Sequence, residues 1–225
     1  VRTSRSGAEE YGDVTIVTPA AWEGDDQYLE ASVGYGDTRR YPTSYAGETG
    51  IEVEAILRRS GFGGDLDRTR LIGRGEMILS LWPRGGHQIV VGASGGTNEG
   101  DSTLQGSFSV GGILGLGLPR GYLEIEAVGD HLVGGSVAYR FPLWRPFQGF
   151  GSSPLAHRQI VTEVFYDIAQ VSRDHLFGDG DSHASVGIQV HDEWEFYGLI
   201  VQPGLGVARQ LDGDEDTVVY FALGF

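Results

Sequence analysis

Arg120 and Asp167 are the residues whose types and surroundings best fit a specific polar contact. Arg120 lies in a glycine-rich stretch where residues 118–122 read LPRGY, and Asp167 lies in residues 164–168, which read VFYDI. An arginine offers five donors in a rigid fork and stays charged in any environment. A loop that presents this fork between glycines is well suited to hold a carboxylate. We therefore predict that Arg120 pairs with Asp167.

Residue types that catalysis or metal binding would need are present, but their spacing does not fit either role. The six histidines (His87, His131, His157, His175, His183 and His191) form no helical i, i+4 pair and have no cysteine beside them. Residues 61–64 (GFGG) lack the lysine and the following helix of a phosphate loop. We expect no catalytic residue, no metal and no cofactor.

Length and composition indicate one domain that binds no nucleic acid. The chain has 225 residues, no cysteine and a formal net charge of -15, whereas phosphate binding needs concentrated positive charge. No apolar run reaches the length of a transmembrane helix. The sequence begins at Val1 without a basic and apolar leader, so we expect a removed signal segment or the later part of a longer polypeptide.

Apolar and polar residues alternate along most of the chain, which predicts β-strands. Eleven windows show this period, separated by turns rich in Gly, Asp and Pro: 14–17, 28–35, 47–59, 68–82, 87–94, 103–110, 133–141, 160–168, 184–191, 195–209 and 219–225. We predict an all-β, antiparallel domain over residues 1–225. Within it, residues 1–11 would be a polar extended lead-in and residues 112–130 a loop that carries the Arg-Gly-Tyr triplet.

Alternation alone does not say which face of the strands is buried, but three features favour a transmembrane β-barrel over a soluble sheet. Several windows approach the roughly 9–11 residues that a tilted membrane strand needs. Aromatic residues gather towards the ends of the windows, as in an interfacial girdle: Tyr28, Tyr35, Trp82, Tyr139, Phe141, Trp144, Trp194 and Tyr197. Charges lie mid-strand on the polar face, where a wet lumen would tolerate them: Glu52, Glu54, Arg74, Glu76, Arg140 and Glu163.

The apolar face is predicted to contact lipid. Its members are Leu29, Val33, Val53, Leu57, Leu71, Leu79, Val91, Phe108, Val137, Val164, Val186, Phe221 and Leu223.

Several motifs resemble the BamA/TamA family of outer-membrane assembly and translocation barrels, also called bacterial surface antigens. They are the triplet Arg120-Gly121-Tyr122, the strand end Tyr139-Arg140-Phe141-Pro142, the pair Phe165 and Asp167, and the alternating C-terminal residues Phe221, Leu223 and Phe225. The resemblance covers residues 108–225. It implies a sixteen-stranded barrel, of which this chain would be the C-terminal part with about 11–12 strands, and five strands after the Arg-Gly-Tyr loop.

Two residues depart from the family pattern. Ala138 stands where the family has Glu, and Ala169 stands where it has Gly. Because that Glu would be a second carboxylate near Arg120, we expect the contact to depend mainly on Asp167.

The resemblance implies a bacterial outer-membrane protein that is not an enzyme and whose partners are the lipid bilayer and unfolded outer-membrane or secreted client proteins. Its mechanism would be strand templating, with the Arg120–Asp167 pair pinning a loop inside the barrel. Two alternatives stay open, namely a membrane anchor or export barrel for an upstream fused domain, and a plain diffusion channel.

Overall fold

The computed structural model describes residues 8–11, 14–17, 25–39, 49–82, 86–101, 107–111, 119–122, 124–150, 154–177, 179–212 and 216–224. These residues form an all-β structure that is dominated by one antiparallel sheet of ten strands. Along the sheet the order is β14-β13-β12-β11-β9-β6-β5-β4-β3, with β10 paired to β11. No helix among the described residues is long and apolar enough to cross a membrane.

The strands of the sheet are long. Their bounds are β3 Tyr28–Arg39, β4 Thr49–Ser60, β5 Arg68–Trp82, β6 His87–Gly100, β9 His131–Trp144, β10 Gln148–Gly149, β11 Leu155–Ser172, β12 Asp181–Phe196, β13 Leu199–Gln210 and β14 Thr217–Gly224. Two further pairs lie outside this sheet, β1 Ala8–Tyr11 with β2 Val14–Val17 and β7 Phe108–Gly111 with β8 Ile125–Gly129. Residues 8–11, within the predicted polar extended lead-in, form strand β1 and pair with β2.

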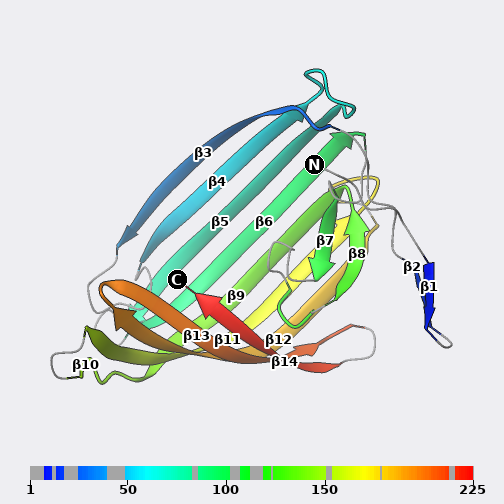
Figure 1. Ribbon diagram of the computed structural model, residues 1–225. Helices are drawn as coiled ribbons and strands as arrows, with labels where there is room; N and C mark the ends of the chain where they lie inside the picture. The colour runs from blue at the N-terminus through cyan, green and yellow to red at the C-terminus, as the bar shows by residue number, and fades with distance from the viewer. Residues whose placement is uncertain are drawn as a thin grey trace.

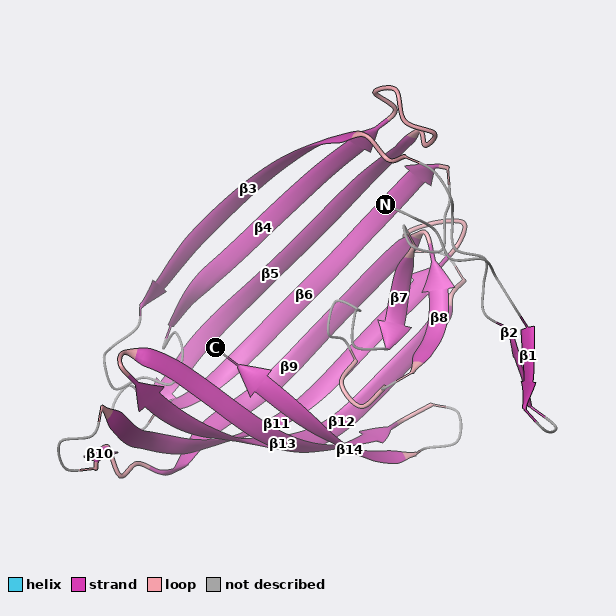
Figure 2. Cartoon of the chain, viewed as in Figure 1, coloured by secondary structure: helices cyan, strands magenta, loops and turns pink. Residues whose placement is uncertain are grey.

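The sheet curls like part of a barrel wall, and the β7–β8 hairpin lies within its concave side (Figure 1). The same view coloured by secondary structure shows β13 and β14 brought round in front of the other strands (Figure 2). Within the described residues the sheet is not closed, because β3 and β14 are its two ends and do not pair with each other. The predicted barrel is therefore present only as an open, curved antiparallel sheet.

The two faces of the sheet differ in polarity, and β11 illustrates the difference. Phe165 and Asp167 point towards the concave side and are buried, whereas Val164, Tyr166 and Ile168 point to the convex side and are each more than 40% exposed. Residues that pair between neighbouring strands lie on the same face, so each face continues across the sheet. The convex row runs Ile51–Met77–Val91–Val137–Tyr166–Val186, and the concave row runs Glu52–Glu76–Gly92–Ser136–Asp167–Ser185. These rows place exposed apolar side chains on the outside of the curve.

The residues predicted for the apolar face lie on this convex side, with one error. Ten of them are exposed: Leu29, Val33, Val53, Leu57, Leu71, Leu79, Val137, Val164, Val186 and Phe221. Val91 is half-buried, and the side chain of Leu223 lies outside the described residues. Phe108 is only 2% exposed, because β7 leaves the sheet and packs on its concave face. The prediction of a wall strand is therefore wrong for residues 107–110, the part of the window 103–110 that the structure describes.

A second correction concerns the window 195–209, which is divided between two strands. Strand β12 ends at Phe196, β13 begins at Leu199, and Tyr197 and Gly198 between them both have positive φ, 49° and 81°. A two-residue hairpin with both φ values positive matches the right-handed twist of its strands. Five strands of the main path still follow the Arg-Gly-Tyr loop, namely β9, β11, β12, β13 and β14.

Candidate functional site

The segment between β6 and β9 folds back onto the concave face, because β6 and β9 pair directly with each other and leave the residues between them out of the sheet. Phe108 of β7 lies under the guanidinium of Arg70, whose Cζ is 4.4 Å from the ring centre. Gly96 of β6 leaves room for the same ring, since a methyl group at Gly96 would lie 2.3 Å from it. The hairpin is therefore fitted to β5 and β6 at one end.

Gly96 gives a direct test of this fit. Gly96→Ala is expected to lower the free energy of unfolding by about 1–3 kcal/mol, because the new methyl group must displace Phe108. Gly73→Ala on neighbouring β5 is the matched control, since nothing lies within 4 Å of a methyl group there. Urea unfolding of both variants measures the difference, and equal stabilities would contradict the fit of the hairpin.

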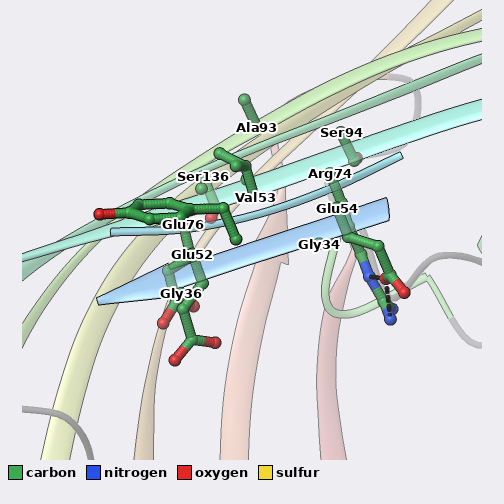
Figure 3. A pocket seen from close by; sticks show the side chains of 13 residues that line it. Gly34, Gly36, Glu52, Val53, Glu54, Arg74, Glu76, Ala93, Ser94 and Ser136 are labelled. Carbon is green, nitrogen blue, oxygen red and sulfur yellow. Dashed lines mark hydrogen bonds and ion pairs between the residues drawn. The ribbon is translucent and has the colours of Figure 1, made fainter. Parts of the chain in front are cut away.

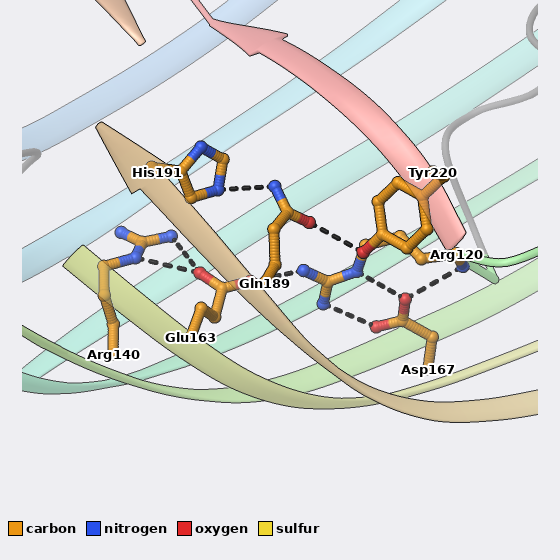
Figure 4. Close-up of polar contacts among 7 residues, drawn as sticks. All are labelled: Arg120, Arg140, Glu163, Asp167, Gln189, His191 and Tyr220. Atoms are coloured by element: carbon orange, nitrogen blue, oxygen red, sulfur yellow. Dashed lines mark hydrogen bonds and ion pairs between the residues drawn. The ribbon is translucent and has the colours of Figure 1, made fainter. Parts of the chain in front are cut away.

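At its other end, the segment brings Arg120 against Asp167 of β11. Nε of Arg120 donates to one carboxylate oxygen at 2.7 Å, Nη2 donates to the other at 2.9 Å, and the backbone N–H of Arg120 donates to the first at 3.0 Å. The Asp167 side chain is 0% exposed. The predicted contact is therefore present, and it is bidentate with an added backbone bond (Figure 4). Charge-assisted bonds of this kind are the strong ones in proteins.

Glu163 is a second carboxylate partner that the sequence reasoning did not assign. Nη1 of Arg120 donates to one oxygen of Glu163, and Arg140 of β9 approaches the other at 2.9 Å through Nε and 2.8 Å through Nη2. Two arginines and two carboxylates therefore balance in charge at the concave face. Asp167 accepts three bonds from Arg120, in line with the expectation drawn from Ala138, and Glu163, four residues before it on the same face of β11, accepts one more.

Phe165 lies between these two carboxylates along β11 and supports the arginine. The Cζ atom of Arg120 is 3.6 Å from the centre of the Phe165 ring, within the range of a cation–π contact. Burial would lower the pKa of the Arg120 guanidinium, but hydrogen bonds and negative charges from Asp167 and Glu163 outweigh burial and raise that pKa. Arg120 is therefore a cation at neutral pH.

Gly121 and Tyr122 each make a separate contact with the sheet. Gly121 has φ 93° and lies so close to β13 that a methyl group would be 2.5 Å from Cβ of Ala208. Its carbonyl accepts a bond of 3.2 Å from Nε2 of Gln210. The Tyr122 hydroxyl donates to the Asp212 carboxylate and lies 3.0 Å from the carbonyl oxygen of Ala184. All three residues of the triplet are thus anchored, on β11, β12, β13 and the residues that follow β13.

Asp212 collects several donors at the end of β13. It accepts from the backbone N–H of Ala184 at 3.0 Å and lies 2.7 Å from Nδ1 of His183. Burial alone would raise the pKa of the Asp212 carboxyl. The bonds from Tyr122 and Ala184 and the nearby His183 outweigh burial and lower that pKa. Burial and the bond to Asp212 raise the pKa of Tyr122. At neutral pH the tyrosine is therefore the donor and the aspartate the acceptor.

A groove of about 620 Å³ lies over the concave face of β3 to β6, with further lining from Ser136 of β9 (Figure 3). Arg74 pairs with Glu54 at 2.5 Å, and the Thr38 hydroxyl donates to Glu52 at 2.8 Å. Glu76 lines the same groove. The Arg74 side chain is 64% exposed, so these charges face open space, unlike the pairs around Arg120.

Of the predicted C-terminal residues, Phe221 does not join this site. Phe221 points outward from β14 and is 65% exposed. The side chain of Leu223 and all of Phe225 lie outside the described residues.

The arrangement around Arg120 provides a charge-balanced clamp between a hairpin and a sheet. Among the described residues, no group of three or more His, Cys, Asp or Glu side chains is placed to hold a metal ion. Comparison of the chain with protein-family models and with curated protein sequences finds no match.

Proposed function

We propose that the chain forms part of the wall of an outer-membrane β-barrel of the BamA/TamA type and works in the insertion or translocation of proteins. The observation that carries this proposal is the reversed polarity of the sheet, with apolar side chains exposed on the convex face and charged pairs on the concave face. In water, such a face would be a large exposed apolar surface, which monomeric soluble proteins rarely have. In a bilayer, the convex face would be covered by lipid and the concave face would line a wet lumen.

Strand length supports the same placement. Strands β5, β11 and β12 have 15, 18 and 16 residues, well beyond the mode of about 5–6 in soluble sheets and long enough for a tilted crossing, which needs roughly 9–11. The groove beside β3 also fits a lumen filled with water, because removing its glutamates and Arg74 from water would cost free energy.

Aromatic side chains gather where β9, β11 and β12 approach their turns at one end of the sheet. The His157 ring stacks on Trp194 at 4.5 Å between ring centres and meets Trp144 edge-on at 5.2 Å. Phe150 stacks with Trp194 at 6.0 Å between ring centres, and Tyr197 is exposed at the β12–β13 turn. Aromatic residues at one level of the wall are typical of the girdle at a membrane interface.

The mechanism that we propose uses the two edges of the sheet. Edge strands present unpaired N–H and C=O groups that can template another strand. Strands β3 and β14 are the edges among the described residues. The Arg120 clamp would brace the wall from inside while an incoming strand pairs with an edge.

Single-cysteine variants test this mechanism cleanly, because the chain has no cysteine of its own. Val33→Cys on β3 and Val219→Cys on β14 place a thiol on each edge, and Val137→Cys on central β9 is the matched control; all three valines are exposed on the convex face. We expect an unfolded outer-membrane porin with one cysteine in its last strand to form mixed disulfides at one or both edges, at least several-fold more than at Val137→Cys. No edge-specific cross-link would overturn an insertion role and favour an anchor.

A further inference from the structure

Tyr220 on the edge strand β14 bonds to a residue two strands away. Its hydroxyl donates to Oε1 of Gln189 on β12 at 2.8 Å, so the side chain passes over β13. Gly206 of β13 makes this possible, because it pairs directly with Tyr220 and a methyl group there would lie 2.3 Å from Cζ of the tyrosine. The edge strand is thus held by its backbone bonds to β13 and by one side chain that reaches β12.

The surface under Tyr220 is also the surface under the Arg-Gly-Tyr triplet. Tyr220 packs against a buried cluster that includes Phe165 and Ala208. Arg120 stacks on Phe165, and Gly121 lies against Ala208. A shift of either Tyr220 or the triplet therefore changes the packing available to the other.

A row of paired polar residues forms a second connection between Tyr220 and the Arg120 clamp. Gln189 lies directly across from Glu163 in the β11–β12 pairing, and Glu163 holds both Arg120 and Arg140. One concave row therefore runs Arg140–Glu163–Gln189–Gly206–Tyr220, from β9 to the edge strand. Figure 4 shows Tyr220 and Gln189 beside the Arg120 clamp.

We propose that Tyr220 is a positioning residue that couples the edge strand β14 to the Arg120 clamp, so that each stabilises the other. The regulatory meaning rests on the proposed function, in which β14 is an edge that receives a strand. While Arg120 is seated on Asp167 and Glu163, β14 is held against β13. When β14 separates from β13, the packing and polar row that support Arg120 weaken. Coupling of this kind is reciprocal by thermodynamic necessity.

Hydrogen exchange reports both ends of the coupling in the same protein. The β14 amides that bond to β13 report the edge, and the Arg120 amide, which donates to Asp167 at 3.0 Å, reports the clamp. Tyr220→Phe removes only the hydroxyl and keeps the ring over Gly206. Because one hydrogen bond is lost, we expect exchange at both reporters to rise by about two- to tenfold in the folded protein in lipid vesicles.

Tyr166→Phe is the matched control, because it makes the same chemical change on the convex face of β11. It should alter neither reporter. Gly206→Ala is a second variant that displaces the ring itself, and it should again move both reporters. Faster exchange at β14 with an unchanged Arg120 amide, in both variants, would mean a purely local role and would overturn the coupling. No client protein is used, so failure of the insertion role would leave this result standing.

Discussion

Arg120→Ala is expected to lower the free energy of unfolding by about 3–5 kcal/mol, because it leaves a fully buried carboxylate without its counter-charge. Asp167 is 0% exposed and takes three of its bonds from Arg120. Glu163 would still have Arg140, so the loss falls mainly on Asp167. Urea unfolding in lipid vesicles, followed by tryptophan fluorescence, measures the change.

Arg74→Ala is the matched control for this prediction. Arg74 also pairs with a glutamate on the concave face, but its side chain is 64% exposed, and exposed pairs contribute only about 0–1 kcal/mol. The double variant Arg120→Ala, Asp167→Ala should recover part of the loss, because neither charge is then left buried alone. Equal effects of Arg120→Ala and Arg74→Ala would show that the clamp adds no more than a surface ion pair.

Most strand positions, and the division of each strand into two faces, were predictable because they depend on a period of two, whereas the choice of the exposed face also needed strand length, the aromatic residues near strand ends and the mid-strand charges. Val164, Tyr166 and Ile168 alternate with Phe165 and Asp167, and this pattern holds whichever strands are neighbours. The contact of Arg120 with Asp167 was also predictable, since Asp167 occupies the matching position of the resembling motif.

Pairing between strands was not predictable in the same way. Residues 108–111 alternate like a wall strand, but β6 pairs directly with β9, so Phe108 turns inward. Nothing in a period of two says which strand lies next to which. The turn at Tyr197 and Gly198 was missed for a different reason: a tyrosine with positive φ is uncommon, and the sequence has no Asn-Gly or Asp-Gly signal there.

For Glu163, the alternation of residue types predicts the face of β11 on which it lies, but its partner on β9 depends on the register between the two strands. Its spacing from Asp167 places both carboxylates on one face of β11, which the alternation already indicates. That Arg140 lies directly opposite Glu163 depends on the β9–β11 register, including a shift near Ile160, and no sequence signal specifies it. The family pattern has its second carboxylate at the position of Ala138 on β9, whereas in this chain the second carboxylate is Glu163 on β11.

Val164→Arg tests whether lipid covers the convex face, and the two environments predict very different results. Val164 lies near the middle of β11 and is 42% exposed. In water, an exposed substitution of this kind changes stability by no more than about 0.5 kcal/mol. On the lipid face of a barrel, arginine near the midplane costs roughly 2–4 kcal/mol. Folding titrations in lipid vesicles therefore separate the two cases by a factor of at least ten in the folding equilibrium.

The cost should also depend on depth, which distinguishes lipid from any other cause of instability. Leu29 lies on the same convex face but at the start of β3, and it is 64% exposed. Arginine costs only about 0–1 kcal/mol near the edge of the hydrocarbon layer, so Leu29→Arg should fold almost as well as the unchanged chain. A lost packing contact would not follow depth in this way, because both side chains are exposed and both changes introduce the same guanidinium. Indifference to arginine at Val164 would place this face in water and overturn the membrane location.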